Sequence, residues 1–204
     1  MTDLERDILK ELMNIILAKA GDSFAKISKE EVLISVPELH MATKTSAITD
    51  ILSNKNIEVI IQSEVKGDLY AHTLIFFSKI QIEMLERVCL KGDLITIKMR
   101  ESLLLEISNI VTGTIVSHLA DILKLNIYGS VPIAPIYKKS IDERELLLDL
   151  DVTRPVLLTV NTVFKTSDCT MDMPMAFILD IPNLTNLLMK IRSINKDNFS
   201  LLKG

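Results

Sequence analysis

Two pairs of residues in this sequence place a carboxylate and an amide at the same helical spacing. Glu11 precedes Asn14 in "ELMN", and Glu106 precedes Asn109 in "EISN", 95 residues further along the chain. An Asn amide both donates and accepts hydrogen bonds and can hold a water molecule, whereas a Glu carboxylate can dock a cation on a partner. No Ser, Cys or His recurs beside both pairs as a nucleophile. These groups fit phosphoryl transfer in which a partner supplies the metal and the phosphoryl group and this chain orients the attacking water. These residue types are compatible with that mechanism, but they do not by themselves select it over other roles.

Each pair belongs to a polar sector on a predicted helix. At 100° per residue, the members of one sector lie within about 60° of each other and opposite the apolar face. The sectors contain Asp7, Glu11, Asn14 and Ala18 in the first copy and Ser102, Glu106, Asn109 and Gly113 in the second. The small residue one turn after each Asn lets another surface approach closely. A solvated outer face remains an alternative for either copy alone, but it is harder to hold for both because many neighbouring residues differ.

The elements that must carry these residues occur twice in the same order. Helical periodicity predicts helices over 3–29 and 102–124, each followed by a strand segment that contains proline, at Pro37 and at Pro132. The remaining predicted elements are a hairpin of 56–65 and 69–78 around the turn Lys66-Gly67-Asp68, a helix over 79–92, strands over 145–152, 155–164 and 173–181, and a helix over 183–193.

An offset of 95 residues aligns the two halves without a gap between residues 7 and 37. It pairs Asn14 with Asn109 and Pro37 with Pro132. The pattern indicates an internal duplication, with repeats of about 3–92 and 98–195. Each half has too few strands to bury its own sheet face, so we expect a single domain over 1–204. Each proline also has an ordinary interpretation, as the start, bend or edge of a strand.

Composition limits the class of protein. Of the 204 residues, 48% are apolar and 25% are charged, so a packed core is expected. The net charge of -4 argues against a nucleic-acid partner held by phosphate contacts. We find no secretory signal and no run of 18 apolar residues, which predicts no membrane span. Cys89 and Cys169 have neither metal-site nor disulfide-framework spacing, so the sequence favours a reduced, cytoplasmic protein.

The two motifs resemble the signature of the CheC/CheX/FliY chemotaxis phosphatases. The spacing Asp7-x3-Glu11-x2-Asn14-x22-Pro37 recurs as Ser102-x3-Glu106-x2-Asn109-x22-Pro132. The segments "ISVPEL" and "KGDLYAHTLIFFS" are also similar to strands of this family. Two motifs in about 200 residues resemble CheC, whereas CheX-type proteins carry one, and FliY- and FliM-type switch proteins carry a further C-terminal domain. Gly113 matches the small residue that the family commonly has four positions after the Asn, whereas Ala18 replaces it in the first copy.

The resemblance implies a fold, an activity and partners. It implies an α+β fold with a pseudo-two-fold duplicated unit, in which two long motif helices pack side by side on one shared antiparallel sheet. The implied activity is hydrolysis of the aspartyl-phosphate of a CheY-like response regulator. Asn14 and Asn109 would orient the water, and Glu11 and Glu106 would pair with the regulator's active-site Lys. The chain would need no cofactor of its own, because Mg²⁺ would belong to the regulator. Many CheC proteins also bind CheD, which becomes a second candidate partner.

Two alternatives stay beside this interpretation. A non-catalytic adaptor that binds a response regulator or CheD would show binding without faster loss of phosphate. A metal or acid–base set of His40, His72 and His118 is a weaker alternative, because these residues fall on different predicted elements. We expect His72 to be an ordinary residue on a sheet face and His118 to lie on the second motif helix.

Overall fold

The computed structural model describes residues 2–28, 31–34, 38–42, 56–90, 94–137, 155–165 and 170–197. The helices are α1 (Asp3–Ser28), α3 (Lys79–Cys89), α4 (Ile97–Leu123) and α6 (Ile181–Asp197). The strands are β1 (Leu33–Ile34), β2 (Glu38–Ala42), β3 (Ile57–Gly67), β4 (Ala71–Ser78), β5 (Ile127–Gly129), β6 (Ile136–Tyr137), β7 (Val156–Lys165) and β8 (Thr170–Leu179).

All of these strands join one antiparallel sheet of eight strands. The order is β1-β7-β8-β4-β3-β5, with β2 also pairing with β7 and β6 also pairing with β3. The hairpins β3–β4 and β7–β8 meet at the centre, where β4 pairs with β8. Each pair of short strands joins the hairpin of the other half of the chain. Strands β1 and β2 pair with β7 of the second hairpin, and β5 and β6 pair with β3 of the first. Each half of the chain therefore completes the sheet of the other half.

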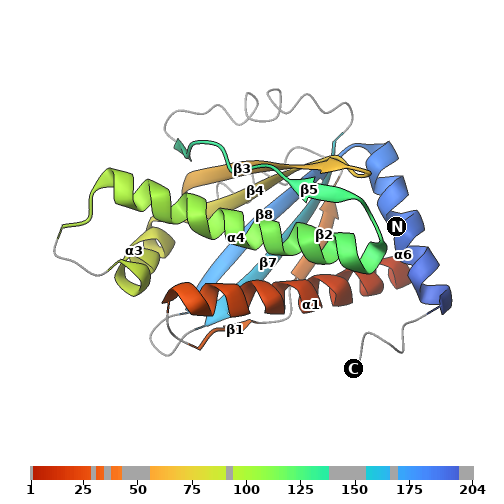
Figure 1. Ribbon diagram of the computed structural model, residues 1–204, viewed down its shortest axis with the longest axis horizontal. Coiled ribbons are helices and arrows are strands. Elements are labelled where there is room, and N and C mark those ends of the chain that lie inside the picture. Colours follow the sequence, from red (N-terminus) through yellow and green to blue (C-terminus); the bar gives the residue numbers. More distant parts are fainter. Residues whose placement is uncertain are drawn as a thin grey trace.

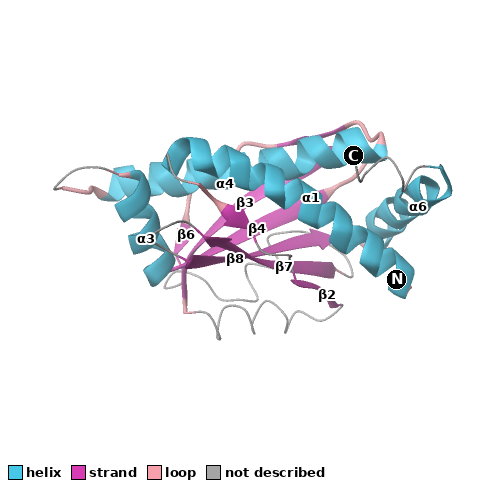
Figure 2. Cartoon of the chain, turned by 90° about the horizontal axis from the view of Figure 1, so that it is seen from below, coloured by secondary structure: helices cyan, strands magenta, loops and turns pink. Residues whose placement is uncertain are grey.

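The helices form a layer on one face of the sheet and close its two ends. Helices α1 and α4 lie side by side across that face and run in opposite directions (Figures 1 and 2). Helix α6 lies at the end where α1 begins, and α3 lies at the end where α4 begins (Figure 1). The α+β fold with two motif helices on one antiparallel sheet is thus confirmed.

The core between α1, α4 and the sheet is almost wholly aliphatic. On β3, the alternate residues Val59, Ile61 and Val65 are buried in this core, as expected for a strand whose side chains alternate between two faces. From α1, Leu12 and Ile16 enter the same cluster, each no more than 1% exposed. The apolar stripes of the two helices therefore face the sheet and leave their polar sectors outward.

Local chemistry explains how the principal elements begin and turn. Helix α1 starts with a capping box, in which Thr2 N donates to Glu5 Oε2 (2.7 Å) and Glu5 N donates to Thr2 Oγ1 (3.3 Å). The β3–β4 turn needs Gly67, whose φ is +113° and whose place for a Cβ lies 2.1 Å from the Asn126 carbonyl oxygen. Any side chain there would clash with backbone.

The sequence-based elements agree with the structure, apart from their boundaries. The second motif helix begins at Ile97 rather than 102, because Thr96 caps it by accepting a hydrogen bond from Met99 N. The proline-containing segments form short strands on either side of the predicted positions, namely β1 with β2 and β5 with β6. The strand predicted over 145–152 lies outside the described residues.

Helix α4 also qualifies the expectation about membrane spans. By length and composition alone, Ile97–Leu123 is the one helix in the described part of the chain that could cross a membrane. Its apolar character has another explanation here, because Leu104, Ile107 and Val111 pack in the core between α4 and the sheet. The buried helix of a folded domain passes the same test of composition.

Candidate functional site

The first motif lies on the outer surface of α1. Asp7, Glu11 and Ala18 are exposed, and Asn14 is half-buried. The capping box fixes where the helix begins, and the apolar stripe buried against the sheet fixes which face points outward. Glu11 and Asn14 therefore lie one turn apart on a surface that a partner can reach.

The second motif lies on the outer surface of α4. Ser102, Glu106, Asn109 and Gly113 are all exposed. At Gly113, an added Cβ would meet no described atom within 4 Å. Packing within the described part of the chain therefore gives no reason for a glycine in the middle of this helix, where glycine costs about 1 kcal/mol relative to alanine. A close approach by another molecule would give one.

The structure brings the two motifs onto one surface. Since α1 and α4 cover the same face of the sheet (Figure 2), both polar sectors point away from it in the same general direction. Within the described ranges, the side chains of Glu11, Asn14, Glu106 and Asn109 make neither a hydrogen bond nor an ion pair. Their carboxylate and amide groups are thus available to an incoming partner, which is what a positioning site requires.

The prolines of the motif have different outcomes. Pro37 lies outside the described residues. Pro132 is half-buried, in the segment between β5 and β6 at the edge of the sheet. Around it, Ser130 N donates to Glu64 O (2.8 Å) and Ile133 N donates to Gln62 O (2.9 Å). Pro132 lacks an N–H and suits this edge, so its location fits the ordinary structural interpretation.

The three histidines do not form a site. His40 lies on β2, His72 on β4 and His118 on α4, where His118 Nδ1 is 2.9 Å from Thr114 O. The described residues contain no group of three or more metal-ligating side chains. His72 is buried on the sheet, as expected from its pattern.

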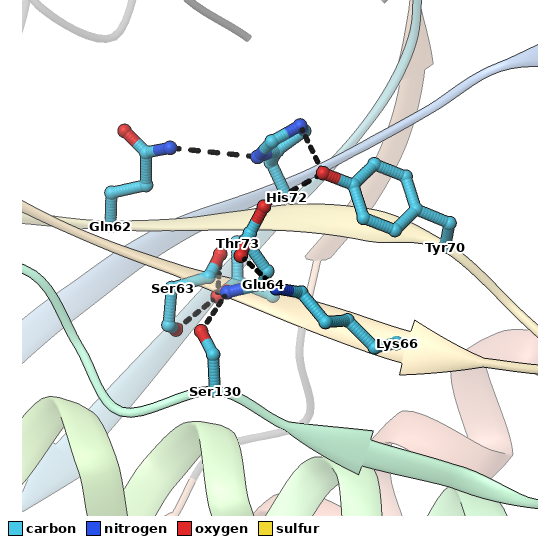
Figure 3. Close-up of polar contacts among 8 residues, drawn as sticks. All are labelled: Gln62, Ser63, Glu64, Lys66, Tyr70, His72, Thr73 and Ser130. Atoms are coloured by element: carbon cyan, nitrogen blue, oxygen red, sulfur yellow. Dashed lines mark hydrogen bonds and ion pairs between the residues drawn. The ribbon is translucent and has the colours of Figure 1, made fainter.

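His72 belongs to a polar chain that the sequence did not indicate (Figure 3). Tyr70 Oη donates to Glu64 Oε1 (2.7 Å) and lies 3.3 Å from His72 Nε2, while Gln62 Nε2 lies 3.5 Å from His72 Nδ1. Because the Tyr70 hydroxyl donates its proton to Glu64, its oxygen accepts from His72 Nε2, and His72 Nδ1 accepts from Gln62. This pattern places the proton of a neutral His72 ring on Nε2. Lys66 Nζ, 2.8 Å from Glu64, holds the pKa of that carboxyl below its usual value, and Tyr70 lowers it further.

This polar chain is remote from the motifs. Gln62, Glu64 and Lys66 alternate along β3 with Val65 and the other core residues, so they project from the opposite face to α1 and α4. The only signal in the sequence was the alternation of polar and apolar residues along the strand. Its partners come from the next strand, and their registry could not be read from that alternation.

Both the sequence and the fold are similar to those of known proteins. A sequence profile of the CheC-like family matches residues 4–41, which contain the first Glu–Asn pair. Over almost the whole chain, the fold is similar to that of FliY from Thermotoga maritima. The TM-score is 0.74 at 13% identity, and the match covers 95% of this chain and 98% of FliY. The sequence of the first motif helix is thus similar to the CheC-like family, and the fold of almost the whole chain is similar to that of FliY.

Other solved structures share this fold. FliM from H. pylori, in a complex with SpeE, has a TM-score of 0.70 at 9% identity and covers 96% of this chain and 98% of its own. CheX from Desulfovibrio desulfuricans has a TM-score of 0.53 at 12% identity, with coverage of 83% and 99%. At such identities these likenesses establish the fold alone. A search of curated protein sequences gave no significant match.

Proposed function

We propose that this CheC-like protein accelerates hydrolysis of the aspartyl-phosphate of a CheY-like response regulator. The observation that carries the proposal is the pair of matching Glu–Asn motifs on the outer faces of α1 and α4, with side chains that have no partner among the described residues. Duplication can copy a solvated acid and amide, but many neighbouring residues of the two copies differ, whereas the acid and the amide keep their types and spacing. A solvated face does not require that agreement. A surface that contacts the same partner at two places does.

In the proposed mechanism, the chain supplies position rather than reactive groups. The regulator carries the phosphoryl group and its own Mg²⁺, which neutralises the developing charge. The amide of Asn14 or Asn109 holds a water in line with the phosphorus, and Glu11 or Glu106 pairs with the regulator's active-site Lys. Such orientation is effective because a misplacement of about 1 Å can cost about a hundredfold in rate.

The exposure of each residue fits its proposed role. Glu11 and Glu106 are exposed and can reach a cation on a partner. Gly113 has no side chain and Ala18 has only a methyl group, so a receiver domain could approach the helix backbone closely one turn after each Asn. Asp7 and Ser102 are exposed one turn before each Glu, where they can border the contact.

A double variant tests the mechanism directly. Asn14→Ala combined with Asn109→Ala should abolish the accelerated loss of phosphate, because both water-positioning amides are removed. Each single variant should retain the activity of the other site. The measurement mixes the protein with purified phosphorylated receiver domains and follows the release of phosphate. Lys10→Ala combined with Ser117→Ala is the matched control, because both residues are exposed on the same two helices. Unchanged acceleration in the double Asn variant would contradict the mechanism.

An adaptor function is the second candidate. It is favoured by the likeness to FliM structures solved with other proteins, namely SpeE and, at a TM-score of 0.67, FliG. An adaptor would bind a response regulator or CheD and leave the rate of phosphate loss unchanged. The unmodified protein separates the two functions, because a phosphatase speeds the loss of phosphate from a receiver domain that it binds, whereas an adaptor binds the receiver domain and leaves that rate unchanged.

A further inference from the structure

Each motif helix is tied near its start to a helix from the other half of the chain. On α1, Glu5 forms a hydrogen-bonded ion pair with Arg192 Nε of α6. On α4, Arg100 Nε forms such a pair with Glu86 of α3. The 95-residue offset of the motifs also relates Glu5 to Arg100. These two pairs therefore occupy matching places. We call each ion pair a tether, and α6 and α3, which supply Arg192 and Glu86, the tether helices. In each copy, the tethered residue of the motif helix lies six residues before the motif Glu.

The carboxylates of both pairs are buried. Glu5 is 3% exposed and Glu86 is 7% exposed. The pKa of Glu5 lies below its usual value, first because Thr2 N donates to it and then because of Arg192. The hydrogen bond to Glu86 raises the pKa of Arg100. The arginines are more open, since the side chain of Arg192 is 61% exposed and that of Arg100 is 38% exposed. Each pair is a charge-assisted hydrogen bond to a buried carboxylate, and it therefore favours one placement of its two helices.

The polarity of the two pairs is reversed. The motif helix contributes the acid in α1–α6 and the base in α4–α3. If α1 docked on α3, Glu5 would meet Glu86, and α4 on α6 would bring Arg100 to Arg192. Two buried carboxylates would meet in the first wrong arrangement and two arginines in the second, so repulsion between like charges disfavours both. Each tether therefore serves one motif helix only.

The tether helices are themselves anchored to the sheet. Asn183 Oδ1 on α6 accepts a hydrogen bond from Tyr70 N (2.8 Å), and Asn186 Nδ2 donates to Asp68 O (2.8 Å), so α6 is fixed to the β3–β4 turn. On α3, Gln81 Nε2 donates to Asp172 O of β8. Helix α4 has a further anchor, because Tyr137 Oη of β6 donates to Glu101 Oε1 (2.8 Å).

We propose that Arg192 and Glu86 are positioning residues, each for one of the two sites. Arg192 sets the placement of Glu11 and Asn14 through Glu5, and Glu86 sets Glu106 and Asn109 through Arg100. A helix rises 1.5 Å per residue and behaves as a rod, so a shift at Glu5 reaches Asn14, about 13 Å away, nearly undiminished. The inference rests on the proposed phosphatase function for its kinetic consequence.

The kinetic test isolates each site in turn. In an Asn109→Ala background only the first site acts, and Arg192→Gln should there lower kcat at least tenfold with little change in KM. In an Asn14→Ala background the same substitution should change kcat by less than twofold. Glu86→Gln should show the reverse pattern, with a smaller loss because Tyr137 still holds α4. A role in stability alone would lower both sites equally, and that result would overturn the proposal.

Controls keep the test independent of folding and of the phosphatase function. Lys190→Gln on α6 and Glu83→Gln on α3 each remove a neighbouring charge of the same sign as the tested residue and should leave both sites unchanged. Arg192→Lys should recover part of the loss. The thermal midpoint should fall equally in both backgrounds. Amide ¹H–¹⁵N spectra of Arg192→Gln should show shifts along 5–18 and not along 102–113. Shifts of equal size on both helices would overturn the positioning role even if no phosphatase activity were found, while absent activity in the unmodified protein would contradict the proposed function instead.

Discussion

The two motif helices expose matching residues on their outer faces, but the side chains on their buried faces differ. Beneath α4, Ser63 Oγ lies 2.6 Å from Thr73 Oγ1 and 3.4 Å from Thr112 Oγ1, and all three residues are buried. The position on α1 that corresponds to Thr112 is Leu17, which is 0% exposed. The buried surfaces of the two copies thus differ, although they share the same fold, while the exposed Glu and Asn agree. Since nothing in the described fold holds those exposed residues, their agreement points to a partner.

The two ends of the helix layer also differ in packing. On the side where α1 ends, Phe24 packs edge-on against Phe164, with ring centroids 5.9 Å apart. On the side where α1 begins, a cavity of about 40 Å³ remains between α1, α4, α6 and the sheet. Its apolar lining includes Leu9, Met13, Ala71, Val116, Leu119 and Leu187. One end of the layer is therefore filled by aromatic rings and the other is not.

The largest expected effect on stability concerns the two buried residues that differ between the copies, Leu17 on α1 and Thr112 on α4. Leu17→Ala should lower the free energy of unfolding by about 2–5 kcal/mol, because it opens a cavity in the apolar core. Thr112→Val should cost less than about 1 kcal/mol, because it keeps the volume and Ser63 keeps its bond to Thr73. Urea denaturation of both variants measures the difference. Equal losses would show that the two surfaces are energetically alike.

The small residues after each Asn provide the next comparison. Gly113→Ala should raise the free energy of unfolding by about 1 kcal/mol, because a helix favours alanine and the added Cβ meets no described neighbour. Ala18→Gly should lower it by about the same amount. If a receiver domain approaches α4 at Gly113, the stabilised variant should also dephosphorylate more slowly in an Asn14→Ala background. A variant that gains both stability and activity would argue against a close approach at this turn.

The smallest expected effect on stability concerns the cavity beside the start of α1. Ala71→Val adds two methyl groups to a strand residue that lines the cavity. It should raise the free energy of unfolding by at most about 1 kcal/mol, the value for filling roughly 40 Å³. The matched substitution at the filled end, Phe164→Leu, should lower stability. Thermal denaturation of the two variants checks the opposite signs, and destabilisation by Ala71→Val would mean that the cavity cannot accept the added volume.

Much of the candidate site was accessible from sequence because it depends on local geometry. The helical period of 3.6 residues alone placed Glu11 beside Asn14 and Glu106 beside Asn109 on outward faces, and their exposure agrees. The hairpin followed from two β-rich runs on either side of the turn signal Lys66-Gly67-Asp68. The start of α4 was placed five residues late, because the cap at Thr96 lacks the acidic residue that marks the start of α1.

By itself, then, the sequence determined which residues share a helix face, where the main strands lie and that the motif occurs twice. Only the tertiary structure decided that the short strands exchange between halves, as in the pairing of His40 with Thr159. It also decided that Glu5 meets Arg192, 187 residues away. Periodicity records the burial of a segment but not the identity of what buries it. Several strand orders satisfy the same alternation, and the choice among them rests on contacts between segments that are far apart in the chain.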